Sequence, residues 1–531
     1  MNNTVLKLDD ELMRRFICDG VLVIDSGMDD ALHETIRVKG ESVNRSFPDI
    51  GGNILPAVSE LQQVLDAPPI KGALQSILGE DYMLHPSKML VPSEPLKPEE
   101  RNIEMRGDEE GLPQGENSRS FTYWHKDTSG PRGRARYHVP RFVFVYYFPQ
   151  DTPFEMGPTR VIPGSQYQDH LSKADHAFAY VPDQVRAGTC IIAALDIDHA
   201  GMSNLTDQTR YMYKFTFMRT RNPQSPSWDG GAGEWQPPEQ KLGGYQHPET
   251  WTYMWNWLRG IRPGSTEPAG NIEEHVGNLN SYDQQKRLAA IYSLGTMGEP
   301  ALDPLVNSLL SVAGKDRIEP AYTQQAGGKF VPNGDPRVRR WLEGGYIFQD
   351  EAFALGCLGG IAVGPLIRLL DNADPWIQMN AAFALGEIGS TADQAIPRLA
   401  EMLDDPNSRV VRAVLEAIAC IGSNTKAALP ALEKLLRRDR SSWNEDMKLA
   451  FLPGDQIHVS AVQALLLSDI DPAEVEDLMV ELLEKPSATV TVPTIALEFL
   501  IRHGSDQSTR HAISYLQAHR WDDTKPQANV S

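Results

Sequence analysis

Residues 380–405 read NAAFALGEIGSTADQAIPRLAEMLDD, and residues 412–438 repeat the pattern as RAVLEAIACIGSNTKAALPALEKLLRR. The Ile-Gly pair at 388–389 returns after 33 residues, and Pro397 returns after the same interval as Pro430. Each copy holds two apolar runs, with a glycine between them and a proline near the start of the second. A fixed period of this length, punctuated in this way, predicts a stack of helix pairs, an α-solenoid.

Weaker copies of this pattern lie on both sides, at residues 289–310, 351–370, 458–485 and 493–519. The copies resemble HEAT repeats of the short, glycine-containing kind. One helix pair cannot cover its own apolar face, so neighbouring pairs stack and share a continuous core. We therefore expect a HEAT-repeat α-solenoid over residues 281–520, followed by a tail at 521–531. The repeats do not identify what they bind, so a protein partner and self-association both stay open.

The first part of the chain has the pattern of strands. Runs rich in β-branched and aromatic residues, several of them bounded by Gly or Pro, occupy residues 20–27, 141–149, 159–165, 188–198 and 210–220. Helical patterning, most clearly over residues 57–79, separates the first run from the second. Early helices followed by evenly punctuated strands predict a β-sandwich or jelly-roll barrel with helices packed outside. The chain is thus expected to be multi-domain, with an α+β domain over residues 1–225 and an all-α domain after a connector.

The connector, residues 226–280, is rich in Pro, Gly and Trp. Trp251, Trp255 and Leu258 have helical spacing and would form one apolar stripe. A flexible linker would not normally contain so many tryptophans. We expect a packing helix that docks the two domains, with the wall of a substrate pocket as the alternative.

The overall composition is that of a globular protein. The chain has 531 residues, 41% hydrophobic and 23% charged, so more than one core is expected. Its formal net charge of −21 argues against a nucleic-acid partner, because such partners usually need a basic face. No apolar run approaches the length of a membrane helix, and the first residues lack the apolar core of a signal peptide.

The cysteines give an expectation about the cellular compartment. They are scattered through apolar surroundings, and no two have CxxC spacing. Reduced, buried thiols in a cytoplasm are the simple interpretation. The four residues are Cys18, Cys190, Cys357 and Cys420.

A candidate metal site begins in the stretch FTYWHKDTSG, residues 121–130. On a strand, His125 and Asp127 would point the same way, because alternate side chains share a face. His199 follows the strand-like run 188–198 and offers a second histidine. Two histidines and one carboxylate leave open positions on Fe(II), the arrangement of non-haem oxygenases.

Arg210 lies eleven residues after His199, at the start of the next strand-like run. A guanidinium there could hold a dicarboxylate co-substrate by a bidentate contact. With the opening LDDELMRRFICDGVLVID, the WHKD box, GPTRVIPGSQ and DIDHAGMSNLTDQTRYMYKF, this order of motifs resembles the phytanoyl-CoA dioxygenase (PhyH) family of Fe(II)/2-oxoglutarate oxygenases. The resemblance covers about residues 8–220.

The resemblance implies a fold and a ligand set. The fold would be a double-stranded β-helix of the jelly-roll, cupin-like kind with flanking helices. His125, Asp127 and His199 match the iron ligands of the family. Arg210 matches the residue that binds the far carboxylate of 2-oxoglutarate, and O2 is the further co-substrate.

Other positions depart from the family pattern. Where the family commonly has a tryptophan beside the co-substrate, this chain has Tyr146. A hydroxyl often follows two residues after the distal histidine, but Gly201 stands there, and Ser203 is the replacement we consider. Candidates for substrate contact are Arg160, Gln166, Arg132 and Arg134. For the last two, a solvated basic loop is the alternative.

The resemblance implies oxidation of an unactivated C–H bond, by hydroxylation or a related route, with release of succinate and CO2. Asp127 disfavours halogenation, because related halogenases lack this carboxylate and bind chloride in its place. Three hypotheses follow for the whole chain. The substrate is a small-molecule metabolite, anionic if the arginines bind it; or it is a protein or carrier-bound group held by the solenoid; or the chain is a catalytically inert HEAT scaffold. The intact ligand set counts against the third.

Overall fold

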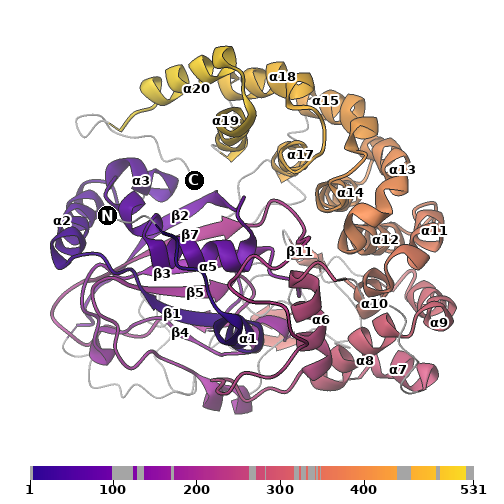
Figure 1. Ribbon diagram of the computed structural model, residues 1–531, viewed down its shortest axis with the longest axis horizontal. Helices are drawn as coiled ribbons and strands as arrows, with labels where there is room; N and C mark the ends of the chain where they lie inside the picture. Colours follow the sequence, from indigo (N-terminus) through magenta and orange to yellow (C-terminus); the bar gives the residue numbers. More distant parts are fainter. Residues whose placement is uncertain are drawn as a thin grey trace.

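The computed structural model describes most of the chain (Figure 1). The described residues are 4–48, 50–97, 124–127, 137–168, 173–261, 271–281, 283–315, 322–324, 330–332, 341–342, 345–346, 348–438, 456–485 and 491–521. The candidate substrate residues Arg132 and Arg134 lie outside these ranges.

A five-stranded antiparallel sheet forms the centre of the N-terminal part. Its strands, in spatial order, are β1 (Val21–Asp25), β5 (Thr189–Ala194), β3 (Phe142–Tyr147), β7 (Arg210–Met218) and β2 (Met83–Ser93). A smaller sheet pairs β4 (Arg160–Val161) with β6 (His199–Ala200). Each of the five predicted runs contains a strand, so this part of the prediction is confirmed.

β2 falls outside the predicted runs, because Pro86 and Pro92 interrupt its pattern. The strand lies at the edge of the sheet, where one side of the backbone needs no strand partner. Its pairing with β7 shifts register between Leu84 and Lys88, which accommodates Pro86.

Short helices flank the sheet. The α-helices are α1 (Asp10–Asp19), α2 (Asp30–Ser46), α3 (Ile54–Ala57), α4 (Leu61–Leu65) and α5 (Pro68–Leu78); the 3-10 turns are η1 (Gly51–Asn53), η3 (Phe154–Met156), η4 (Ser165–Tyr167) and η5 (Lys173–Phe178). The helical pattern over residues 57–79 is thus divided between α4 and α5. Pro68 begins α5, because a proline fits the first turn of a helix but disfavours helical conformation in the residue before it.

The two faces of the sheet have separate cores. Val145, Tyr147 and Phe215 belong to the main core, which continues into the flanking helices. The Tyr213 hydroxyl donates to the Ile36 carbonyl of α2 at 3.1 Å. Alternate side chains of the same strands point the other way, as strand geometry requires. They form a second, smaller core that includes Phe144, Tyr146, Ile191 and Met212.

The connector contains helix α6 (Pro248–Leu258), which packs against α1 and α8 (Gln284–Thr296). Trp251, Trp255 and Leu258 are buried, as their spacing predicts. The Trp255 ring lies 5.2 Å from that of Trp228, centroid to centroid. These contacts fit the expected packing helix between the two parts of the chain.

Helix pairs follow the connector. They are α7 (Ile272–Asn278), α8, α9 (Glu299–Leu310), α10 (Asp350–Leu358), α11 (Gly360–Leu369), α12 (Pro375–Ile388), α13 (Ile396–Glu401), α14 (Ser408–Ile421), α15 (Leu429–Arg437), α17 (Gln456–Leu466), α18 (Pro472–Glu484), α19 (Thr491–His503) and α20 (Asp506–Ala518). Short elements join them: β8 (Tyr322–Gln324), β9 (Phe330–Pro332), β10 (Trp341–Leu342), β11 (Gly345–Tyr346), η6 (Gly389–Ala395), η7 (Met402–Asp404) and η8 (Thr425–Ala428).

The repeated Ile-Gly pair has a backbone cause. Gly389 ends α12 with φ of 75°, and Gly422 ends α14 with φ of 62°. These are left-handed conformations that residues with a Cβ adopt at a cost. Pro397 and Pro430 lie in the first turns of α13 and α15, which also fits the prediction.

The helix pairs form an arch around the sheet domain (Figure 1). The inner row, α8, α10, α12, α14, α17 and α19, stacks helix on helix and faces the sheet domain. Several polar contacts join the arch to that domain, among them the following three. Arg141 Nη2 lies 2.9 Å from Glu387 Oε1 of α12, Asn222 Nδ2 donates to the Cys420 carbonyl of α14 at 3.1 Å, and Arg502 Nη1 of α19 donates to the Asp81 carbonyl at 2.9 Å.

None of the four cysteines, all of which lie in the described ranges, forms a disulfide. Three are buried as predicted, but Cys420 is only partly buried. It lines a small cavity between α12, α14 and Tyr137, at the junction of the arch with the sheet domain. Within the described ranges, no helix has the length and apolar character needed to cross a membrane.

Candidate metal centre

Backbone hydrogen bonds join His199, the distal histidine, to the segment that contains His125 and Asp127, called the HxD segment below. His125 N donates to the His199 carbonyl at 3.2 Å, and His199 N donates to the His125 carbonyl at 3.1 Å. β6 begins at His199 and pairs with β4, where Val161 lies opposite it. Residues 74 positions apart in the sequence are therefore neighbours in space.

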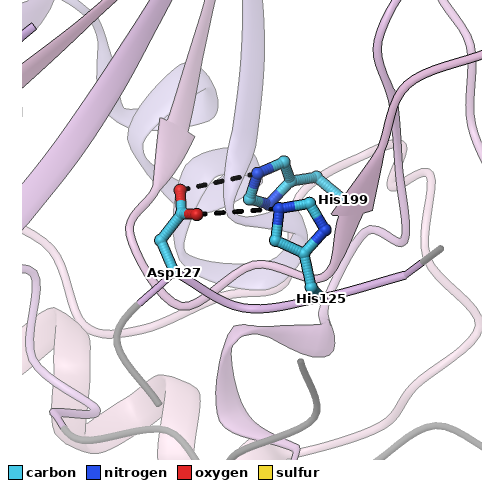
Figure 2. Close-up of side chains that lie close together, drawn as sticks. All are labelled: His125, Asp127 and His199. Carbon is cyan, nitrogen blue, oxygen red and sulfur yellow. Dashed lines mark ion pairs between the residues drawn. The ribbon is translucent and has the colours of Figure 1, made fainter. Parts of the chain in front are cut away.

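The three predicted ligands converge (Figure 2). Nε2 of His125 lies 3.6 Å from Oδ1 of Asp127, and Nε2 of His199 lies 3.5 Å from Oδ2 of the same carboxylate. One donor atom from each residue lies within 4.8 Å of the others. His199 is buried, whereas His125 and Asp127 keep about 30% of their side-chain surface exposed, so solute can reach one side of the cluster.

The tautomer of His199 is set by a hydrogen bond. Its Nδ1 lies 3.1 Å from the Ile197 carbonyl, which can only accept, so Nδ1 carries the proton. Nε2 is then the atom with a free lone pair, and it faces the cluster. Burial lowers the pKa of His199 to about 3, against the opposing effect of Asp127, so the ring is neutral at neutral pH.

Asp127 is an anion beside the ammonium group of Lys214. Burial raises its pKa, but Lys214 and the two histidines lower it, and the net value lies below the usual range. Lys214 Nζ donates to Asp127 Oδ2 and lies 4.1 Å from the centroid of the Phe144 ring. The sequence analysis missed Lys214. Its spacing of four from Arg210 on one strand puts both side chains on the same face, and this alternation is the signal that could have found it.

Arg210 stands at the start of β7 and is 4% exposed. Burial lowers its pKa to about 10. Its Nε and Nη1 are buried and have no hydrogen-bond partner among the residues that the structure describes. A buried guanidinium with unused donors is costly unless an anion completes it, so Arg210 is suited to bind a carboxylate.

Tyr146 lies beside the cluster. It pairs with Lys214 across β3 and β7, and its ring centroid is 5.8 Å from that of His199. Its hydroxyl is buried and has no partner in the described part of the chain. Tyr146 therefore places a buried hydroxyl close to one of the three predicted ligands.

The remaining predicted residues have different surroundings. The Arg160 guanidinium lies 4.6 Å from the centroid of the Trp124 ring. Trp124 directly precedes His125 in the sequence. Ser203 is buried after β6. Gln166 is also buried, and its Nε2 donates to the Ile17 carbonyl at 3.2 Å, so it stabilises the end of α1. The structure thus gives Gln166 a packing role, and we do not retain it as a substrate residue.

Two family models match the chain. Residues 109–212 match phytanoyl-CoA dioxygenase (PhyH), and residues 363–445 match HEAT repeats. The chain carries a PhyH domain followed by HEAT repeats. No curated protein matches it.

Solved structures show limited similarity to part of the chain. A non-heme monooxygenase, ThoJ in a nickel complex, is 20% identical, with 43% of this chain and 89% of that chain covered and a TM-score of 0.28. The carbocyclase SnoK from nogalamycin biosynthesis is 17% identical, with 40% and 85% covered and a TM-score of 0.29. HygX from Streptomyces hygroscopicus, solved with nickel and 2-oxoglutarate, is 14% identical, with 45% and 96% covered and a TM-score of 0.29.

The PhyH family uses Fe(II) and 2-oxoglutarate, and the residues present fit both. Two imidazole nitrogens and one carboxylate oxygen are a donor set for Fe(II) that leaves positions open. The unused donors of Arg210 fit an organic dianion.

Proposed function

We propose that the PhyH domain is an Fe(II)- and 2-oxoglutarate-dependent dioxygenase that hydroxylates, or otherwise oxidises, an unactivated C–H bond of a small-molecule metabolite. Succinate and CO2 are the co-products. The observation that carries the proposal is the convergence of His125, Asp127 and His199 on one point of the sheet face that also holds Arg210. The sheet would then be one layer of a jelly roll, and β4–β6 part of the other.

Each residue has a defined task. His125, Asp127 and His199 hold Fe(II), which with 2-oxoglutarate and O2 supplies the oxidising chemistry when bound. Arg210 binds the far carboxylate of 2-oxoglutarate, and this anchor orients the co-substrate. Lys214 holds the Asp127 carboxylate by donating to Oδ2. Because Asp127 is present, we expect hydroxylation or a related oxidation rather than halogenation.

Two further residues would contact the co-substrate in this proposal. Tyr146 excludes water from one side of the co-substrate with its buried ring, and its hydroxyl can donate to a carboxylate. Ser203 is a second hydroxyl donor. Arg160 is retained as a candidate contact for an anionic substrate, since it lies against Trp124 beside the HxD segment.

The arch bears on the choice between small and macromolecular substrates. HEAT repeats commonly bind proteins, and a protein or carrier-bound substrate on the inner face is the second candidate. That inner face already contacts the PhyH domain through Glu387, Cys420 and Arg502. This arrangement favours the small-molecule substrate. The inert scaffold is the least favoured, because the donor set is complete.

Equilibrium binding of Fe(II) to metal-free protein tests the assignment of the ligands. We expect one Fe(II) per chain in the wild type, measured by anaerobic dialysis. His199→Ala should lose this binding, whereas His33→Ala, at a buried histidine that contacts Tyr147 of the main core, should retain it. Stoichiometric binding in His199→Ala would refute the ligand assignment.

A further inference from the structure

Lys126 lies between the two ligands of the HxD segment and is fully buried. On an extended segment, alternate side chains point to opposite sides. His125 and Asp127 face the metal centre, and Lys126 therefore points away from it, into the protein. Its ammonium group is thus a buried charge that neither iron nor 2-oxoglutarate requires.

The ammonium group joins three parts of the chain. Nζ donates to the Ser165 carbonyl at 2.6 Å and to the Asp196 carbonyl, and it lies 3.3 Å from Oδ2 of Asp198. Asp198 is 1% exposed and directly precedes His199. The ion pair therefore links the residue between two proposed ligands to the residue next to the third.

The turn after β4 adds further contacts to the Lys126–Asp198 ion pair. The Asp198 backbone N donates to Ser165 Oγ at 2.8 Å, and Ile162 N donates to the Asp198 carbonyl at 3.0 Å. Ser165 thus contacts both members of the ion pair. This contact gives the PGS motif of the sequence a structural role.

Stability alone does not account for such a pair. Desolvation of two charges offsets most of their attraction, and well-packed apolar residues in place of a buried pair are often equally stable. What the pair does provide is a fixed geometry, because an ion pair with additional backbone contacts has few alternative arrangements. The ion pair thereby fixes the HxD segment relative to the segment that contains His199, and these two segments supply the three proposed ligands.

We propose that Lys126 and Asp198 are positioning residues that set the distance between the HxD segment and His199, and so determine the metal affinity of the centre. This inference rests on the proposed function, since it assumes that these ligands bind a metal. Loss of a residue that holds a metal ligand in place typically lowers metal affinity by 10- to 100-fold, and an effect of this order is expected here.

The test compares variants in the full-length, metal-free protein, with Co(II) as the probe. Calorimetric titration gives the Co(II) affinity, and thermal unfolding without metal gives stability. Lys126→Met should lower both, because Asp198 is left as an uncompensated buried charge. The double variant Lys126→Met/Asp198→Leu removes both charges and should recover most of the thermal stability. Its Co(II) affinity should stay at least about tenfold below that of the wild type.

A purely structural pair gives a different result. In that case the double variant recovers stability and Co(II) affinity together, and the inference is overturned. If the double variant does not fold, Asp198→Asn decides, because it keeps the side-chain size and the backbone contacts to Ser165 and Ile162. Weakened Co(II) binding in folded Asp198→Asn supports the inference, and wild-type affinity overturns it.

A matched control uses a buried pair far from the metal centre. Arg287 of α8 and Asp350 of α10 lie 3.4 Å apart, and both are nearly buried. Arg287→Met should lower thermal stability and leave Co(II) affinity unchanged; an equal loss of Co(II) affinity there would mean that any destabilisation weakens the site. If the wild type itself binds no Co(II), the proposed function fails together with the inference. If the wild type and all the variants bind equally, only the inference fails.

Discussion

Lys214 places an ammonium group against a carboxylate that is also a proposed metal ligand. In the proposed function the dianion 2-oxoglutarate binds next to Asp127, where the Lys214 charge would attract it, so Lys214→Met should weaken 2-oxoglutarate binding. We expect a loss of about tenfold, on the order of 1.4 kcal/mol. Titration of 2-oxoglutarate into the Fe(II)-loaded protein measures it. Lys88→Met, on β2, is the control, because Lys88 Nζ donates to the Pro86 carbonyl instead. Equal affinities in Lys214→Met and the wild type would contradict this role.

We expect Arg210 to contribute more than Lys214 to 2-oxoglutarate binding. Its buried Nε and Nη1 have no other partner in the described residues. Arg210→Ala should therefore lower the affinity for 2-oxoglutarate by about a hundredfold or more. Fe(II) binding should persist, since Arg210 is not among the ligands. Separate titrations of metal and co-substrate distinguish the two effects. Retention of 2-oxoglutarate affinity would show that another residue binds the far carboxylate.

The sequence could predict the cluster of candidate ligands but not the residues that support it. His125 and Asp127 follow from strand alternation, and His199 and Arg210 from the order of motifs. Strand alternation puts Lys214 on the same face as Arg210, but the partners of Lys126 and Lys214 could not be assigned in the same way. They lie far along the chain: Lys126 pairs with Asp198, and Lys214 with Asp127 across 87 residues. Only the pairing of strands brings these residues together.

At the scale of elements, a glycine conformation ends a helix of the arch. Gly422 has φ of 62° after α14, and a Cβ there would lie 3.1 Å from the Leu467 carbonyl oxygen. Gly422→Ala should therefore lower the free energy of unfolding by about 1 to 2 kcal/mol. Gly364→Ala is the control, because Gly364 lies inside α11 and a Cβ there meets nothing closer than 3.8 Å. Chemical denaturation compares the two. A Gly422→Ala variant as stable as Gly364→Ala would contradict the conformational argument.

His247, at the start of α6, makes stability depend on pH. Burial lowers its pKa to about 4, with Lys241 adding to the effect and Asp283 opposing it. In the unfolded chain the pKa of His247 is near its ordinary value of 6.5, whereas in the folded chain it is about 4. Between these two pH values the unfolded state binds a proton that the folded state does not, so the free energy of unfolding falls as the pH drops through this interval. His247→Gln should reduce that fall, measured as the difference in Tm between pH 7 and pH 4.5. Part of the fall should remain, because burial also lowers the pKa of His85 and His199. An unchanged difference would contradict the assignment.

The predicted elements were most accurate where one residue type determines the backbone. Ile-Gly and Pro spacing predicted the helix pairs because glycine ends the helices at positive φ and proline begins them. β-branched and aromatic runs predicted five strands. The pattern failed at β2, where an edge position and a shift of register tolerate prolines that usually argue against a strand. Over residues 57–79, where the sequence has helical patterning, the structure has two helices that are divided near Pro68.

At the scale of the whole molecule, the arch and the PhyH domain stabilise each other. Arg141 and Glu387 form a nearly buried pair across 246 residues of sequence. Arg141→Met should therefore lower the free energy of unfolding by about 3 to 5 kcal/mol, because Glu387 is left uncompensated. A double-mutant cycle with Glu387→Gln measures the coupling. The Arg398–Asp371 pair within the arch is the control; it is more exposed, and its coupling should stay under about 1 kcal/mol. Similar couplings in both pairs would contradict the idea that this junction is a structural link.

The two-part organisation could be predicted from the change in pattern along the chain, but the closure of the arch around the PhyH domain could not. That closure depends on single contacts, such as Arg502 with the Asp81 carbonyl, between residues 421 positions apart. The repeated pattern does not predict this contact.

The central claim is that His125, Asp127 and His199 form an iron centre that takes 2-oxoglutarate. The most direct measurement is the visible charge-transfer band that develops when Fe(II) and 2-oxoglutarate are added together to the metal-free protein without O2. We predict a band in the wild type that requires both additions and is absent in His199→Ala. Absence of the band in folded wild-type protein, or its persistence unchanged in His199→Ala, would contradict the account.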